Sequence, residues 1–254
     1  MDEKLIPYIV IGLAGLSTGI GSLPILFSED VSQKKLDVLL GAAAGIMLAA
    51  TCFSLIVPSL EAGGGTIKEV LITSLGIFLG GVFLDLVDKY SPHEHLLDHR
   101  KEGVDNNNLK RIWLFVIAIT IHNFPEGLAT GVGFGAGNIS DGITIATGIA
   151  IQNLPEGLAV ALSLRGVGYS KKEAIIISAL TGFVEPIAAL LGLGLVSIFK
   201  PLLGFILAFA GGAMLFVISD EIIPETHRNG FEREATYGIM IGFIIMLILD
   251  VSLG

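Results

Sequence analysis

Two ten-residue segments of the chain are nearly identical and carry polar side chains inside long apolar runs. They read IHNFPEGLAT (residues 121–130) and IQNLPEGLAV (residues 151–160). In the first segment, His122 and Glu126 are four residues apart, which places them on one face of a helix. Gln152 and Glu156 have the same spacing in the second segment. Each segment therefore offers a carboxylate and an imidazole or amide to the same side of its helix.

Each segment also carries an asparagine and a proline. Asn123 and Asn153 precede the two glutamates by three residues and can reach the same face. Pro125 and Pro155 have no backbone N–H, so each frees a carbonyl one turn earlier in its helix. Inside a membrane, helices interrupted in this way are tolerated where they line a cavity or pack against other helices. We therefore predict two Pro-kinked helices that line one site.

A third glutamate occurs in the segment TGFVEPIAAL, where Glu185 is followed by Pro186. We expect Glu126, Glu156 and Glu185 at one depth near the middle of a bilayer, because each lies about 11 to 17 residues into its apolar run, at about 1.5 Å per residue. Burying one ionised carboxylate costs several kcal/mol, and three close together repel one another. A bound cation would remove both problems.

Two structural explanations compete with a cation site. Each glutamate could be protonated and hydrogen-bonded to a neighbouring helix, or the repeated Pro-Glu-Gly could serve only helix packing. The first explanation suits an isolated glutamate better than three at one depth beside a histidine and two asparagines. The second accounts for Gly127 and Gly157 but not for the glutamates. We therefore favour a metal site.

The types of side chain restrict the metal. Carboxylate, imidazole and amide ligands without thiolate suit borderline to hard divalent ions, with Zn²⁺ first and Cd²⁺, Fe²⁺ or Mn²⁺ as further candidates. Because Glu126 and Glu156 could each bridge, two adjacent metal positions are expected. One would use His122, Glu126, Gln152 and Glu156, and the other Asn123, Glu126, Asn153, Glu156 and Glu185.

The composition indicates how these side chains are positioned. The chain has 254 residues, of which 52% are hydrophobic and 15% charged, against about a quarter charged in soluble domains. We predict an all-α polytopic membrane protein with eight transmembrane helices. Apolar runs of sufficient length cover residues 5–27, 36–60, 66–87, 111–134, 139–164, 172–198, 201–224 and 234–253. The whole chain, 1–254, is then one transport domain with a polar loop at 88–110.

The positions of lysine and arginine predict the orientation, since these residues concentrate in cytoplasmic loops. With eight spans, one side of the membrane holds Lys4, Lys68 and Lys200. The other side holds Lys34, Lys35, Lys89, Arg100, Lys101, Lys110, Arg111, Arg165, Lys171, Lys172, Arg228 and Arg233. We expect the second side to be cytoplasmic, with both termini outside, in what we take to be a bacterial inner membrane.

Several classes of protein are excluded or disfavoured. The single Cys52 cannot form an internal disulfide or a thiolate cluster. The net charge of −9 argues against nucleic acid, and neither a nucleotide-binding loop nor the H-E-x-x-H pattern of metallohydrolases occurs. No enzyme activity and no organic cofactor are expected. Glycines four residues apart predict close helix packing: Gly15/Gly19, Gly41/Gly45, Gly76/Gly80, Gly127/Gly131 and Gly238/Gly242.

Taken together, HNFPEG, NLPEG, the later Glu-Pro and the eight spans resemble the ZIP (Zrt/Irt-like) metal transporters, and in particular their GufA-like branch. The resemblance runs through the whole chain. It implies import of divalent metal into the cytoplasm, a binuclear midplane site, a homodimer, and alternating access of an elevator type. Many members have a second histidine where this chain has Gln152, so metal preference is expected to depend on this position.

The resemblance also implies residues along the metal pathway. The second span faces the pathway in this family, and by depth Met47, Thr51 and Ser54 are candidates. Glu61, Asp141 and Asp250 lie at outer helix ends and could collect cations. On the cytoplasmic side the matching positions are Asp88, His93, His95, Asp220 and Glu221, with Glu94, Asp98, His99, Glu225 and His227 nearby.

The leading hypothesis is therefore a transporter of divalent metal ions, with metal ions and the lipid bilayer as its partners. A membrane metal sensor or scaffold that binds without translocating is the alternative. Measurement of metal flux across a membrane distinguishes the two.

Overall fold

The structure is a computed structural model that describes residues 5–28, 31–62, 64, 66–90, 106–136 and 139–253. Within these ranges every regular element is helical, which confirms the predicted all-α class. The first half contains α1 (Ile6–Ser22), η2 (Leu23–Leu26), α2 (Gln33–Ala49), η3 (Ala50–Ile56), α3 (Val57–Ala62), α4 (Ile67–Tyr90) and α5 (Asn106–Gly135). The second half contains α6 (Ile139–Gly166), α7 (Lys171–Gly182), α8 (Val184–Ile198), η4 (Lys200–Leu202), α9 (Leu203–Val217), η5 (Ile218–Ile222), α10 (Ile223–Thr226) and α11 (Glu232–Leu253).

Several of these helices have the length and apolar character of membrane spans, as expected of an integral membrane protein. Over the described residues, seven stretches qualify: Ile6–Leu26, Gln33–Ala62, Ile67–Val87, Ile139–Gly166, Lys171–Ile198, Leu203–Thr226 and Glu232–Leu253. They correspond to all the predicted spans except the fourth, 111–134. That segment lies in α5, whose 30 residues are about 45 Å long at 1.5 Å per residue. The total of eight spans stays a prediction.

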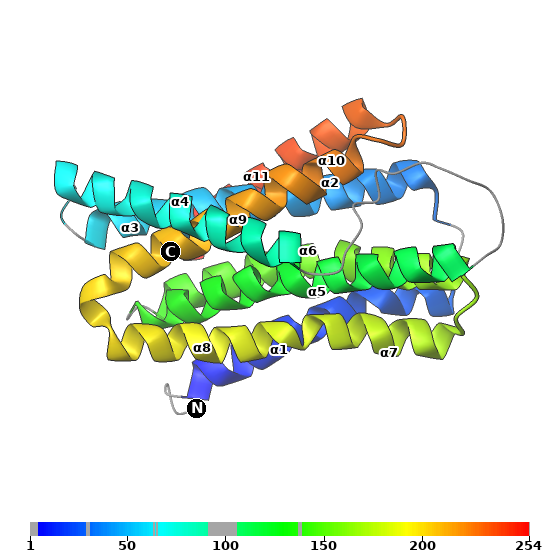
Figure 1. The fold of residues 1–254 in the computed structure, drawn as a ribbon, viewed down its shortest axis with the longest axis horizontal. Helices are drawn as coiled ribbons and strands as arrows, with labels where there is room; N and C mark the ends of the chain where they lie inside the picture. Colours follow the sequence, from blue (N-terminus) through cyan, green and yellow to red (C-terminus); the bar gives the residue numbers. More distant parts are fainter. Residues whose placement is uncertain are drawn as a thin grey trace.

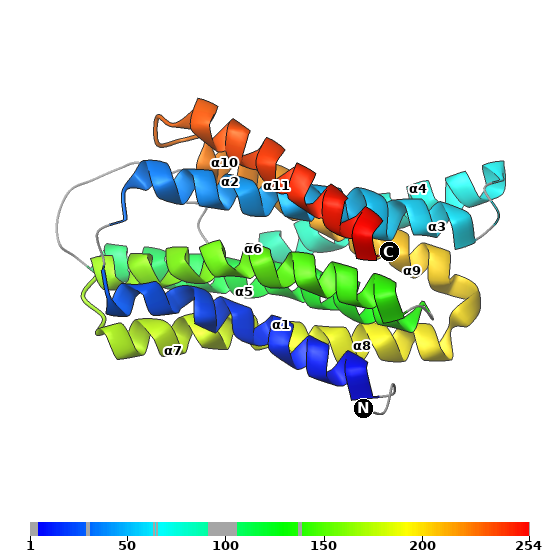
Figure 2. The same cartoon turned by 180° about the vertical axis from the view of Figure 1, so that it is seen from behind.

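The helices form two bundles that lie side by side along the long axis of the molecule. One bundle contains α1 and α5 to α8, and the other contains α2 to α4 and α9 to α11 (Figures 1 and 2). The most extensive helix pairings are α1 with α6 and α5 with α8 in the first bundle, and α2 with α11 and α4 with α9 in the second. The bundles meet mainly where α6 packs on α2 and where α5 packs on α9.

Glycines allow the paired helices to approach closely, as their spacing predicted. A Cβ on Gly131 of α5 would overlap the carbonyl oxygen of Ala189 on α8, and one on Gly242 of α11 would overlap that of Ala42 on α2. Both members of each predicted glycine pair lie at such a contact with another helix. Small residues at this spacing allow van der Waals packing of backbones where no hydrophobic effect drives association.

The helical geometry departs from prediction in three places. The sixth span, predicted as one helix over 172–198, is divided at Phe183 into α7 and α8, because Pro186 cannot donate to the carbonyl of Gly182. By contrast, Pro125 lies inside α5 and Pro155 inside α6, and each helix continues on both sides of its proline. The second and seventh spans each contain a π-helical stretch, η3 and η5, a feature that is frequent at functional sites.

Candidate metal centre

All seven side chains of the predicted midplane site belong to the first bundle and are buried. His122, Asn123 and Glu126 lie on α5, Gln152, Asn153 and Glu156 on α6, and Glu185 in the first turn of α8. None of them exposes more than 3% of its surface. Polar side chains at this depth are costly unless they bind one another or a ligand.

Hydrogen bonds join the three helices at these residues. Gln152 Nε2 donates to Glu126 Oε1 at 2.7 Å, which connects α6 to α5. Asn153 Nδ2 donates to Glu185 Oε1 at 2.8 Å, which connects α6 to α8. Asn123 Nδ2 donates to the carbonyl oxygen of Thr181 on α7 at 2.8 Å. The structure therefore brings the two Pro-Glu-Gly segments and the later Glu-Pro into one polar cluster.

The oxygens of this cluster are left largely without partners. Of the eleven buried side-chain nitrogen and oxygen atoms that lack a hydrogen-bond partner among the described residues, nine belong to these seven side chains. They are both ring nitrogens of His122, both carboxylate oxygens of Glu156, Oε2 of Glu126 and Glu185, Oδ1 of Asn123 and Asn153, and Oε1 of Gln152. Of these, His122 Nε2 lies at ion-pair distance from Glu221 Oε1, which leaves eight atoms without a partner of either kind. Each amide thus uses its nitrogen as a donor and leaves its oxygen free. Eight unpartnered nitrogen and oxygen atoms in one buried cluster are unusual, and they are of the types that bind cations.

The cluster is not arranged as a closed coordination shell. Within the described part of the chain, no three His, Cys, Asp or Glu side chains converge as a group that could hold a metal ion. The amide groups of Gln152 and Asn153 hold one oxygen each of Glu126 and Glu185. A metal would therefore have to draw these carboxylates together and compete with the amide donors. Assignment of the seven residues as ligands stays a prediction.

One contact crosses between the bundles at this site and was not predicted. His122 Nε2 lies 2.5 Å from Glu221 Oε1, which η5 of the second bundle supplies. The sequence analysis assigned Glu221 to the cytoplasmic exit, because it lies near the end of its apolar run. The π-helical turn and the packing of α9 on α5 place its carboxylate against the predicted ligand instead. No local pattern in the sequence indicates this pairing, since it depends on which spans are neighbours.

A residue at the site that the sequence did not indicate is Thr18 on α1. Its side chain is fully buried, and its hydroxyl donates to Glu185 Oε1 at 3.3 Å. No predicted ligand lies on α1, so nothing in the motif spacing singles out this threonine.

The candidates on the second span occupy different environments. Met47 is buried in the main apolar core, and the Thr51 hydroxyl donates to its carbonyl oxygen at 2.8 Å. Ser54 Oγ donates to Asp250 Oδ1 on α11 at 2.7 Å, so the structure joins two residues that were predicted separately. Glu61 is exposed at the end of α3 and Asp141 is half-buried in the first turn of α6.

Two of the candidates at the opposite end of the molecule are bonded to residues that were not predicted for the pathway. Asp220 is exposed. The Glu225 carboxylate pairs with Arg228 at 2.5 Å, and the two ring nitrogens of His227 lie 2.9 Å from the Ile223 carbonyl and 3.0 Å from the Thr236 hydroxyl. The positions 93, 94, 95, 98 and 99 lie outside the described residues, as does the side chain of Asp88.

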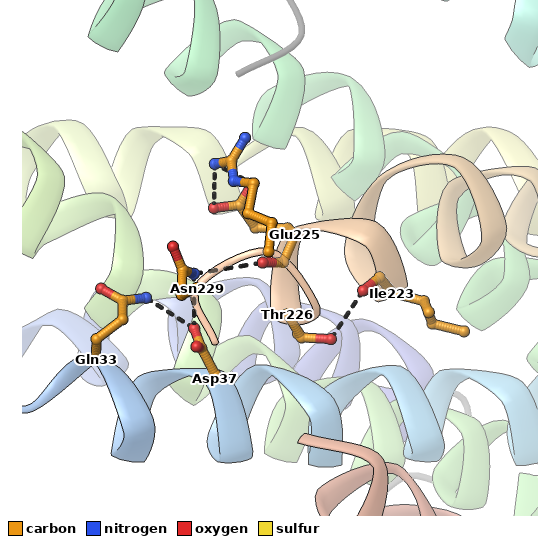
Figure 3. Close-up of polar contacts among 7 residues, drawn as sticks. Gln33, Asp37, Ile223, Glu225, Thr226 and Asn229 are labelled. Atoms are coloured by element: carbon orange, nitrogen blue, oxygen red, sulfur yellow. Dashed lines mark hydrogen bonds and ion pairs between the residues drawn. The ribbon is translucent and has the colours of Figure 1, made fainter. Parts of the chain in front are cut away.

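A buried carboxylate that the sequence analysis did not identify lies beside this region. Asp37 of α2 is 1% exposed, and its Oδ1 accepts from Gln33 Nε2 at 2.7 Å and from Asn229 Nδ2 at 3.1 Å (Figure 3). These bonds attach the start of α2 to the turn between α10 and α11. The role of Asp37 is structural, because it holds the turn in which Gly230 adopts a φ of +86°.

Comparison with known proteins gives consistent matches. Residues 88–250 match the family model described as "ZIP Zinc transporter". The zinc transporter GufA of Myxococcus xanthus is 47% identical over 95% of this chain and 96% of its own length. The zinc transporter ZIPB of Bordetella bronchiseptica is 42% identical over 96% of this chain and 80% of its own length. The zinc transporter ZIP11 of Homo sapiens is 32% identical over 94% of both chains.

Proposed function

Because the chain belongs to the ZIP zinc transporter family, we propose that this integral membrane protein carries Zn²⁺ across the membrane into the cytoplasm. It is a transport protein and not an enzyme, as the names of its relatives indicate. Cd²⁺, Fe²⁺ and Mn²⁺ are the other ions that its donor set suits, since all accept carboxylate, imidazole or amide ligands.

The observation that supports the proposal is the set of eight buried atoms on seven residues that have neither a hydrogen-bond nor an ion-pair partner. A buried donor or acceptor without a partner costs about 1–3 kcal/mol. A protein that only folds would replace such groups by apolar ones. A divalent cation that enters the cluster compensates the carboxylate charges and binds the free oxygens together. Cation binding therefore explains why these buried polar groups are present despite their free-energy cost.

Two metal positions that share Glu126 and Glu156 account best for the distribution of free atoms. Both oxygens of Glu156 and one of Glu126 lack partners, so each carboxylate has lone pairs to bridge with. His122 and Gln152 would complete one position, and the two asparagines with Glu185 the other. Metal binding would displace any protons that these groups hold.

The two-bundle architecture supports alternating access as the route. In this proposal the first bundle carries the metal ligands, and the second bundle provides the wall past which they move. The contact between His122 and Glu221 would open when the metal occupies the histidine. The positive-inside distribution of lysine and arginine supports odd-numbered loops in the cytoplasm and both termini outside. A single domain, a bacterial inner-membrane location and a homodimer complete the proposal.

Uptake by reconstituted vesicles tests the transport function. Vesicles that contain the purified protein should accumulate Zn²⁺, and Glu126→Ala or Glu156→Ala should abolish accumulation while the variants elute and melt as folded proteins. Accumulation that is unchanged in both variants would contradict the proposed site. Zinc binding without flux in the wild-type protein would instead support the sensor or scaffold alternative.

A further inference from the structure

Helix α1 contributes no predicted ligand, yet it packs on α6, which carries three of them, and on α7, which leads into α8 and Glu185. A Cβ on Gly157, the glycine of the second Pro-Glu-Gly, would overlap the carbonyl oxygen of Thr18. A Cβ on Gly182 would lie 2.7 Å from the Thr18 hydroxyl oxygen and 2.8 Å from the carbonyl oxygen of Gly15. Figure 2 shows α1 running across the first bundle beside α6 and α7. The backbone at Thr18 is therefore packed closely against α6 at Gly157 and against the end of α7 at Gly182.

The hydroxyl group of Thr18 is used differently from those of five other threonines in the spans. Thr51, Thr120, Thr130, Thr144 and Thr147 each donate to a carbonyl four residues earlier in their own helix. This local bond is the usual solution for threonine in a helix. Thr18 instead donates across the bundle to Glu185 Oε1 at 3.3 Å.

Both donors that reach the Glu185 carboxylate bind the same oxygen. Asn153 Nδ2 donates to Oε1 at 2.8 Å and the Thr18 hydroxyl donates to it at 3.3 Å. The second oxygen, Oε2, is buried and has no partner. Two donors on one oxygen fix the rotation of a carboxylate and determine which oxygen stays available.

From this geometry we propose that Thr18 is a positioning residue for zinc binding, which holds Glu185 so that Oε2 faces the metal. The proposal rests on the proposed function, because it takes Glu185 as a metal ligand. Thr18 itself does not touch the metal. It acts through the carboxylate, and it extends the site to a helix outside the sequence motifs.

The substitution Thr18→Val tests the role of the hydroxyl with little change in shape. Loss of a residue that orients a metal ligand weakens metal binding by roughly 10- to 100-fold. We expect about 10-fold here, the lower end, because Asn153 still holds the same oxygen and the Thr18 bond is the longer of the two. Thr18→Ser retains the hydroxyl and should restore binding to within about twofold of the wild type.

Thr144→Val is the matched control. Thr144 is 1% exposed, and its hydroxyl donates to the Ser140 carbonyl of the same helix at 3.0 Å. The control therefore removes a buried threonine hydroxyl from the first bundle without touching a predicted ligand. Its zinc affinity should match that of the wild type.

Zinc affinity of the purified full-length protein, measured by competition with a chromophoric chelator, provides the readout. A double-mutant cycle with Glu185→Gln completes the test: if Thr18 acts through Glu185, Thr18→Val should cause no further loss in that background. Thr18→Val that binds as the wild type does, or Thr18→Ser that binds as weakly as Thr18→Val, would refute the positioning role and leave the proposed function intact. Wild-type protein that binds no zinc would overturn the proposed function, and this inference with it.

Discussion

Replacing Glu156 by glutamine is expected to stabilise the metal-free protein and to remove most of the additional stability that zinc binding provides. Glu156 is 3% exposed, and neither of its carboxylate oxygens has a hydrogen-bond partner. An ionised carboxylate buried in this way costs several kcal/mol, whereas an unsatisfied neutral group of the same shape costs about 1–3 kcal/mol. The difference favours glutamine by about 2 kcal/mol in the absence of metal.

Zinc should remove most of this difference. At a concentration 100 times its dissociation constant, a ligand adds about 2.7 kcal/mol to the stability of the protein that binds it. If the loss of one carboxylate ligand weakens binding about 100-fold, the same concentration adds only about 0.4 kcal/mol to Glu156→Gln. The variant is then the more stable protein without zinc, and the two proteins are nearly equal with it.

Thermal unfolding in detergent, with and without zinc, measures both effects. A change of 1 kcal/mol moves the melting temperature of a chain of this size by about 2–4 °C, so the metal-free variant should melt roughly 4–8 °C above the wild type. Glu232→Gln, which changes an exposed glutamate in the first turn of α11, is the control and should alter neither value appreciably. A metal-free Glu156→Gln that melts below the wild type, or one that keeps the full zinc response, would refute the reasoning.

Three other predictions follow from the geometry. Gln152→His should add a nitrogen ligand and shift the ratio of zinc to manganese uptake in vesicles toward zinc; an unchanged ratio would show that this position does not set selectivity. Gly127→Ala should reduce uptake at least 10-fold, because its Cβ would overlap the backbone of α8, whereas Gly194→Ala, which meets open space, should leave uptake unchanged. Asp37→Ala should lower the free energy of unfolding by about 1–3 kcal/mol, since it removes the buried acceptor of two hydrogen bonds, each worth about 0.5–1.5 kcal/mol; chemical denaturation measures the loss, and an unchanged stability would contradict the structural role.

Features governed by local chemistry were predictable from the sequence. Hydropathy placed the membrane spans, because a bilayer requires about 20 apolar residues whatever their neighbours are. Glycine spacing predicted where helices approach, and the structure places Gly127 against the backbone of Glu185. The i, i+4 spacing of His122 and Glu126 predicted a shared face, and the bond between Gln152 and Glu126 shows that the two segments lie at one level.

Features that depend on which helices are neighbours were not predictable. The approach of Glu221 to His122 needs both the pairing of α9 with α5 and the π-helical turn of η5. A π-helical turn is a compromise between backbone bonding and tertiary packing, and no residue type specifies it. The bond of Asp37 with Asn229 likewise joins residues 192 positions apart in the chain, and an isolated aspartate near a helix start predicts only a solvated end.

The pairing of the helices has a consequence for how the protein is made. Each of the four most extensive pairs unites one helix from the first 135 residues with one from the remainder: α1 with α6, α5 with α8, α2 with α11, and α4 with α9. During synthesis the first four of these helices enter the bilayer before any of their principal partners exist. Their glycine-containing faces must therefore contact lipid until the second half of the chain has been synthesised and inserted. Truncation after α5 should therefore leave helices that insert but do not associate, and the second bundle is complete only after α11 has been made.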